Sequence, residues 1–172
     1  MRHVAFLRNV NQGQQGHPST DDLRRAFAEA GCTEVVPFQS NGTVVFEATD
    51  PEQVVADAVA ALAARSGTER EAFRMPMHDV VRLVEAHSAE PDAQRRELTL
   101  HGGSAIDLRG AANVREAARR RCVIAETGEG WAVSINERDH ESNATPTLER
   151  ITGLPATSRG LPTLVRLVAR FG

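Results

Sequence analysis

The chain contains no lysine and no tyrosine, and aromatic residues make up only 4% of it. All 20 of its basic side chains are therefore arginines. Without lysine the chain has no amine nucleophile for Schiff-base chemistry and no phosphate-loop lysine. Without tyrosine it lacks that acid/base group, and its few rings offer little surface on which nucleobases could stack.

Cysteine is also scarce, because Cys32 and Cys122 are the only two and form no CxxC pair. We therefore expect neither a disulfide framework nor a zinc site, and a reducing compartment fits the chain best. The six histidines show no metal-ligand spacing such as HxxxH. The sequence predicts no metal and no cofactor.

Long hydrophobic runs are missing as well. The apolar stretch near the N-terminus is too short for a signal peptide, and no segment reaches the roughly 18 apolar residues of a membrane span. We expect a cytoplasmic protein with no membrane partner.

The chain does contain enough apolar residues to form a hydrophobic core. Its 172 residues are 41% hydrophobic and 25% charged, which suits one domain or two small ones. The formal net charge of -3 supplies no basic field for a polyanion, so nucleic acid is not expected as a partner.

Hydrophobic periodicity and capping residues predict six elements in the first half of the chain. In order these are a strand at 3–8, a helix capped near 19 or 20 and ended by Gly31, strands at 34–38 and 43–48, a helix from 51 to Gly67, and a strand at 70–75. The dipeptide Asn41-Gly42 predicts a hairpin between the middle strands. The order is that of a ferredoxin-like unit with both helices on one sheet face. We expect its first and third strands to be parallel, which would place the Asn9 loop and the Asn41 hairpin at opposite ends of the sheet.

The overall expectation is an α+β fold, with a ferredoxin-like subdomain at 1–76, a connecting helix and linker at 77–94, and a smaller α/β subdomain at 95–172. In the last part the sequence predicts strands at 97–101, 122–126 and 131–135, with helices ending near 121, near 147–152 and at 163–171. This order resembles the first half without its fourth strand, which weakly suggests a duplication.

Three segments resemble the bacterial domain-of-unknown-function 1697 family. They are Val4-Ala5-Phe6-Leu7-Arg8-Asn9-Val10-Asn11, Phe38-Gln39-Ser40-Asn41-Gly42-Thr43-Val44-Val45-Phe46, and the stretch from Leu148 through Leu154-Pro155-Ala156-Thr157-Ser158-Arg159 to Leu167. The resemblance spans nearly the whole chain and implies a shared fold, but it implies little about activity.

The chain also departs from the family's usual motifs. Asn9 replaces a glycine, Asn41-Gly42 reverses Gly-Asn, His140-Glu141-Ser142 stands where Gly-Arg-Ser is usual, and Gly160-Leu161-Pro162 replaces Asn-Trp-Asn. If these positions form a site shared by the family, the departures are consistent either with a different substrate or with a lost activity.

The polar residues that the resemblance carries over are Arg8, Asn11, Gln39, Ser40, Thr157 and Arg159. Arginine binds a carboxylate or phosphate bidentately, while amides and hydroxyls supply neutral donors. We therefore predict a small polar or anionic ligand between the two halves, with Arg8 and Arg159 as anchors and Asn11, Gln39 and Ser40 orienting it. An equally weighted alternative is that these side chains only fix turns.

Two other functions remain open. His140, flanked by Asp139 and Glu141, is the best acid/base candidate by residue type and would make the protein a small-molecule enzyme, although a solvated loop is the simpler interpretation. The third hypothesis is an interaction module that forms a homodimer through an open sheet edge.

Overall fold

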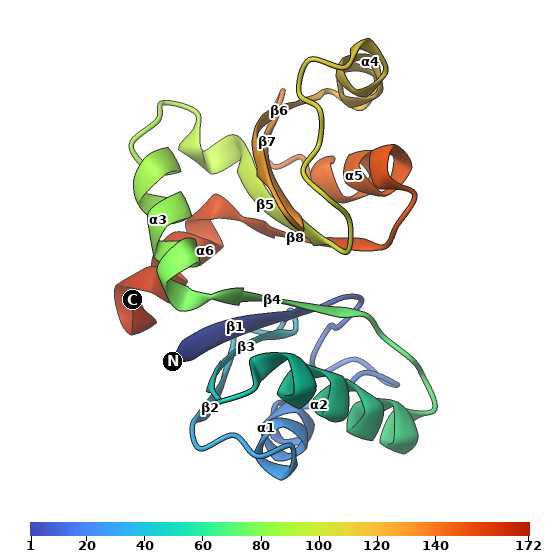
Figure 1. Cartoon of the computed structure of the whole chain (residues 1–172), viewed down its shortest axis with the longest axis vertical. Helices are drawn as coiled ribbons and strands as arrows, with labels where there is room; N and C mark the ends of the chain where they lie inside the picture. Colours follow the sequence, from blue (N-terminus) through green and yellow to red (C-terminus); the bar gives the residue numbers. More distant parts are fainter. The chain divides into compact units, whose positions relative to one another are not determined.

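The computed structural model describes all 172 residues and shows a mixed α/β chain with two four-stranded antiparallel sheets and six α-helices (Figure 1). It divides into two compact units. Unit 1 comprises Met1–Val80 with Phe171, and unit 2 comprises Val81–Arg170 with Gly172. None of the helices combines the length and apolar character that crossing a membrane requires.

Unit 1 contains the six elements in the order that the sequence predicts. They are β1 (Arg2–Leu7), α1 (Thr20–Glu29), β2 (Val35–Phe38), β3 (Thr43–Glu47), α2 (Pro51–Ser66) and β4 (Ala72–Pro76). The sheet order is β2-β3-β1-β4. Every neighbouring pair is antiparallel, including β1 and β3. The expectation that the first and third strands run parallel was therefore wrong.

Helix α1 begins where local hydrogen bonding predicts. The Ser19 hydroxyl accepts from the backbone nitrogen of Asp22, and the Asp22 carboxylate accepts from the backbone nitrogen of Ser19, which together form a capping box. The bond from the Ser19 backbone nitrogen to the charged carboxylate is the main cause that lowers the pKa of Asp22, and the Ser19 side chain lowers it further. Helix α2 has Asp50 as its N-cap and ends at Gly67, whose φ of 70° is left-handed.

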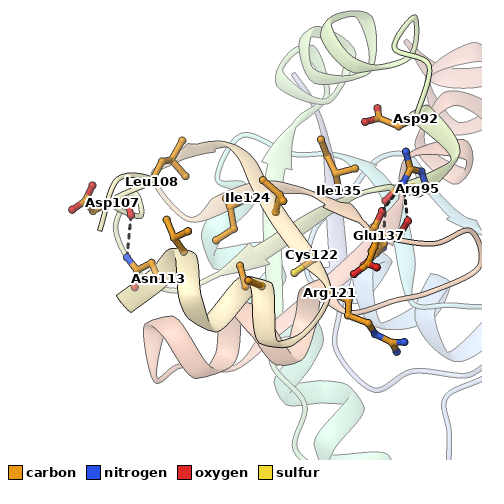
Figure 2. A pocket seen from close by; sticks show the side chains of 15 residues that line it. Asp92, Arg95, Asp107, Leu108, Asn113, Arg121, Cys122, Ile124, Ile135 and Glu137 are labelled. Atoms are coloured by element: carbon orange, nitrogen blue, oxygen red, sulfur yellow. Dashed lines mark hydrogen bonds between the residues drawn. The ribbon is translucent and has the colours of Figure 1, made fainter. Parts of the chain in front are cut away.

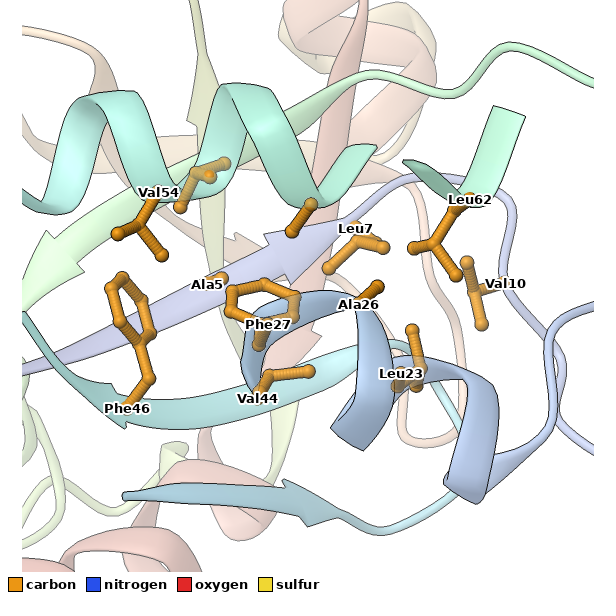
Figure 3. Close-up of a cluster of buried hydrophobic side chains, with 12 residues drawn as sticks. Ala5, Leu7, Val10, Leu23, Ala26, Phe27, Val44, Phe46, Val54 and Leu62 are labelled. Carbon is orange, nitrogen blue, oxygen red and sulfur yellow. The ribbon is translucent and has the colours of Figure 1, made fainter. Parts of the chain in front are cut away.

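Helices α1 and α2 cover one side of this sheet, and the core of unit 1 lies between these helices and the sheet (Figure 3). Phe27 of α1 packs against Phe46 of β3 with ring centroids 5.3 Å apart. Leu7, Leu23 and Val10 close the same cluster near the end of β1. Val10 belongs to the loop after β1, so the core fixes where that loop starts.

Helix α3 (Met77–His87) follows β4 directly. The later elements are η1 (Ala93–Arg95), β5 (Arg96–His101), α4 (Ala111–Arg119), β6 (Cys122–Gly128), β7 (Trp131–Asn136), α5 (Ala144–Thr152), β8 (Ala156–Gly160) and α6 (Leu161–Phe171). The second sheet has the order β6-β7-β5-β8. The prediction of no fourth strand was wrong, because β8 pairs antiparallel with β5.

The two units share one topology. Replacing β1 to β4 by β5 to β8 converts the first sheet order into the second. After each sheet a five-residue last strand leads without a loop into an eleven-residue helix, β4 into α3 and β8 into α6. The order of elements thus repeats along the chain, although the sequence shows no repeat of residues.

Unit 2 has a polar interior next to α5. The carboxylate of Glu97, a buried residue of β5, accepts hydrogen bonds from Asn136 Nδ2 at 2.9 Å, the Ser142 hydroxyl at 2.6 Å and the backbone nitrogen of Ala144 at 3.3 Å. The N-cap residue of α5, Asn143, makes no side-chain capping bond. Glu97 therefore satisfies a free donor at the start of this helix from the sheet.

A second polar cluster, in which His87 and Arg96 are buried, holds the end of α3. His87 Nε2 lies 2.8 Å from Glu126, and Nδ1 faces the guanidinium of Arg96. Arginine has only donors, so Nδ1 must accept and the ring proton belongs on Nε2, pointing to Glu126. Both ring nitrogens are thus used in tying α3 to the sheet, which is a structural task for a histidine with no predicted role.

Candidate functional site

The loop after β1 and the β2–β3 connection lie at the same end of the sheet, because β1 and β3 are antiparallel. The backbone nitrogen of Leu7 donates to the carbonyl of Gly42, and that of Gln12 donates to the carbonyl of Ser40, both at 2.9 Å. We call residues 9–12 together with 39–42 the loop cluster. It brings together Asn11, Gln39 and Ser40, with Arg8 directly before it in the chain.

Two residues of the loop cluster have left-handed backbone conformations without being glycine. Asn9 has φ 55° and Gln39 has φ 57°. Asparagine tolerates this region, but a long side chain such as that of glutamine rarely adopts it, at a cost of about 1–3 kcal/mol. The hairpin is consequently not a two-residue Asn-Gly turn. Its four-residue connection uses positive φ at Gln39 and at Gly42, where φ is 76°.

The predicted ligand-binding side chains in the loop cluster face solvent. Asn11, Gln39 and Ser40 are exposed, whereas Gly42 beneath them is buried. The backbone nitrogen of Asn11 donates to His17 Nδ1 at 3.0 Å, which fixes the loop from within. The three polar side chains are therefore carried on a backbone that is held in place.

Arginines brace this end of unit 1. Arg8 is a quarter exposed, and its Nη1 lies 3.6 Å from Glu71. Arg70 donates from Nε to the carbonyl of Asn9 at 3.2 Å and from Nη2 to that of Gly16 at 3.0 Å. Arg70 holds both ends of the 9–16 loop, while Arg8 has its charge partly balanced by a half-exposed carboxylate.

The loop cluster also contains a residue that the sequence did not single out. The side-chain nitrogen of Gln12 is buried and has no hydrogen-bond partner. Native proteins rarely leave a buried donor unpaired, so this amide is a candidate for contact with an acceptor atom of a ligand. Gln12, Gln14 and Gln15 follow one another closely in the sequence, and nothing in that pattern shows which of them turns inward.

Arg159 and Thr157, the other residues carried over by the resemblance, belong to β8 in unit 2. Arg159 is only 6% exposed, and its Nη1 donates to the Thr157 hydroxyl and the Ser158 carbonyl, both at 2.9 Å. Burial lowers the pKa of Arg159 to about 10. Its joint role with Arg8 in one site stays a prediction.

The acid/base candidate lies in an exposed turn of unit 2, where His140 has φ 63°. Its neighbours contact other residues. Glu141 pairs with Arg121 at 2.9 Å, and Asp139 lies 3.9 Å from Arg95. The two carboxylates thus bind arginines, and neither orients the imidazole.

Neither cysteine has the environment of a nucleophile. Burial raises the pKa of Cys32 to about 11 and also raises that of Cys122, which lies 3.3 Å from the Thr147 hydroxyl. No group of three histidine, cysteine, aspartate or glutamate side chains in the chain is arranged to hold a metal ion.

Comparison with known proteins identifies a family and a fold. The sequence model of the family described as "Protein of unknown function (DUF1697)" matches residues 1–123. A solved structure, that of the conserved bacterial protein SP0830 from Streptococcus pneumoniae, is similar with a TM-score of 0.60 and 13% identity. The similarity covers 98% of this chain and 97% of that one. A search of curated proteins found no match.

Proposed function

The chain belongs to the DUF1697 family, and we propose that it binds a small polar or anionic ligand at the loop cluster. Gln39, Ser40 and Asn11 would orient the ligand, Gln12 would donate to one of its acceptor atoms, and Arg8 would meet an anionic group. The observation that carries this proposal is the unpaired, buried amide nitrogen of Gln12 beside exposed polar side chains on a strained backbone.

The strain at Gln39 supports a role beyond fixing a turn. A glycine at this position would allow the same left-handed conformation at lower cost, as Gly42 does nearby. A glutamine there retains a donor and an acceptor on its side chain at the expense of stability. Strained non-glycine residues gather at binding and catalytic sites.

The unpaired donor of Gln12 and the charge of Arg8 both favour a ligand rich in acceptor atoms. A carboxylate or phosphate oxygen would satisfy the amide and could displace Glu71 from Arg8, since a pair at 3.6 Å with a half-exposed partner is weak. A neutral amide or sugar would use the exposed side chains without disturbing that pair. Arg159 as a second anchor stays a prediction.

The test is a screen of small carboxylates, phosphates and neutral polar compounds by ligand-detected NMR on the full chain. Compounds that bind are then measured against Q39G. We expect Q39G to be more stable by about 1 kcal/mol and to bind more weakly, since it relieves strain and removes a contact. The matched control is H140G, which relieves a similar φ of 63° outside the loop cluster and should leave binding unchanged.

Arg8→Ala and Gln12→Leu complete the set, and Arg159→Met tests the remaining anchor. A ligand whose affinity is the same in wild type, Q39G, Arg8→Ala and Gln12→Leu would refute a site at the loop cluster. Loss of binding in Arg159→Met alone, with the fold intact by circular dichroism, would move the site to unit 2.

The same H140G variant examines the enzyme alternative, because an acid/base role for His140 requires that its removal abolish turnover.

We further propose a cytoplasmic location, supported by the absence of any cysteine pairing, since both thiols are free.

A further inference from the structure

Unit 2 contains a groove that the loop cluster does not involve. It has a volume of about 530 Å³ and runs along α4 and the outer strand β6. We call it the α4–β6 groove. Its apolar lining comes from both sides of this outer strand: Val114, Ala117 and Ala118 of α4 lie on the sheet face of Ile124, whereas Val123 and its cross-strand partner Ile135 of β7 lie on the other face. We call these residues together the apolar wall. A volume of this size lies within the usual range for small-molecule sites.

The apolar wall is unusually open to solvent. Val114 is 53% exposed and Val123 is 63% exposed, and Leu108 at one end of the groove is 38% exposed. These are three of the six large hydrophobic residues that the chain exposes. Exposed apolar residues that line a concavity indicate a binding surface.

One end of the α4–β6 groove contains two arginines, of which Arg121 is paired with Glu141 at 2.9 Å. Figure 2 shows Arg95 and Arg121 at this end, with Asp107 and Asn113 at the other. Arg95 Nη1 donates to the carbonyls of Glu137 at 2.8 Å and Asn136 at 3.4 Å. Neutral carbonyls therefore orient its guanidinium, and the carboxylate paired with it, Asp139, lies 3.9 Å away and is more than half exposed.

The acidic residues at this end leave room for an anion. Asp92 contacts Arg96 at 2.6 Å, so its charge is already balanced within the protein. Arg96 is also what lowers the pKa of Asp92. The exposed side chain of Glu137 lies in water, where screening weakens its repulsion of an anion. Arg95 remains as an oriented donor whose only paired carboxylate, that of Asp139, is 3.9 Å away and exposed to solvent.

We propose that the α4–β6 groove binds an amphipathic carboxylate, with an aliphatic body along Val114 and Ile124 and the carboxylate at Arg95. Burying the chain against the apolar wall supplies affinity, and the oriented guanidinium supplies the preference for an anion. This site is in unit 2 and is independent of the ligand proposed for the loop cluster.

The probe is decanoate, titrated into the full chain by isothermal calorimetry below its micellar concentration, with decanol and decylamine as partners of the same chain length. We expect saturable binding of decanoate at one site per chain, with the alcohol weaker by about fivefold and the amine weaker still. V114D should weaken decanoate binding by about tenfold, because it places a charge in the apolar wall. R95Q should weaken it by about fivefold.

The matched controls are R115Q, which removes an exposed arginine of the same helix outside the groove lining, and V165D, which alters an exposed valine of α6. Both should leave affinity within about twofold. R95Q also removes the bonds to the carbonyls of Asn136 and Glu137. R121Q, at the same end, should weaken decanoate binding less than R95Q does, because Arg121 is already paired with Glu141 at 2.9 Å. Circular dichroism confirms that each variant is folded.

Three results would overturn the proposal. The first is no saturable binding of decanoate. The second is equal binding of decanoate and decanol, or an equal effect of V114D and V165D. The third is light scattering that shows a dimer which V114D dissociates, because the occupant of the groove would then be a second copy of the chain.

Discussion

Gly42 and Val10 approach so closely that a β-carbon on Gly42 would lie 2.8 Å from the Cβ atom of Val10. It would also lie 3.1 Å from the Cβ and carbonyl oxygen of Leu7. All three are Cβ or backbone atoms, so they could make room for a β-carbon only if the backbone of Leu7 or Val10 shifted. This contact locks the two loops of the loop cluster together.

Gly42→Ala should therefore destabilise the protein by about 2–4 kcal/mol, which combines the strain of φ 76° with overpacking. The matched control is Gly67→Ala, where φ is 70° and a β-carbon would meet nothing within 4 Å. That variant should cost about 1 kcal/mol from backbone strain alone. Urea unfolding at constant pH measures both, and equal losses would mean that the close approach to Val10 has no energetic weight.

The interior of unit 2 gives a second prediction, at Glu97. In Glu97→Gln the amide nitrogen could replace the oxygen that faces Ser142, because that hydroxyl is able to accept as well as donate. The amide oxygen would still accept from Asn136 and Ala144. We expect a loss of only about 1 kcal/mol for Glu97→Gln but about 3 kcal/mol for Glu97→Leu, which leaves buried donors unpaired.

The rearrangement can be checked with Ser142→Ala in both backgrounds. If the Ser142 hydroxyl accepts from the glutamine amide, Ser142→Ala should still lower the free energy of unfolding in the Glu97→Gln background. In the Glu97→Leu background the hydroxyl has lost that partner, and Ser142→Ala should have little further effect. If Glu97→Gln and Glu97→Leu destabilise equally in urea unfolding, the negative charge itself, acting at the start of α5, is the dominant contribution.

Local patterns allowed most of the elements to be predicted. Ser19 before the helix, the proline after Asp50, and the apolar run that ends at Phe46 are local features, and the structure has the corresponding helices and strand. Strand β8 was missed because Ala156-Thr157-Ser158-Arg159-Gly160 has little strand propensity. Its pairing with β5 is a tertiary effect that the segment itself does not encode.

The candidate sites were less predictable, for two reasons. The error about strand direction wrongly separated the loop after β1 from the hairpin, although the sequence resemblance had identified Asn11, Gln39 and Ser40. The α4–β6 groove gave no signal, because Val114 and Val123 look like core residues in a one-dimensional pattern. Only the fold shows that both are exposed.

Cysteine reactivity gives a third prediction. The pKa of Cys32 is raised from 9.0 to about 11 by burial, so its thiolate fraction near pH 8 should be roughly a hundredfold lower than that of an unperturbed thiol. Iodoacetamide labelling followed by mass spectrometry should show slow modification of Cys32 in the native chain. In urea both cysteines should react quickly, which provides the control. Fast labelling of native Cys32 would show that its thiol is not shielded.

The last prediction concerns pH and His3, which is buried in β1. Burial lowers the pKa of His3, and the charges of Arg74 and the N-terminus lower it further. In the unfolded chain the pKa is near the ordinary 6.5. Above about pH 7 both states are neutral, so His3 contributes no pH dependence there.

As the pH falls below about 6.5, the unfolded chain binds a proton that the folded chain resists binding, so stability must decrease by up to about 1.4 kcal/mol per pH unit for this group. His101, whose pKa burial also lowers, should add to the decrease. Urea unfolding between pH 7.5 and 5 should therefore show a shallower slope for His3→Leu than for wild type. An identical slope in His3→Leu would mean that His3 is protonated as readily in the folded chain as in the unfolded one.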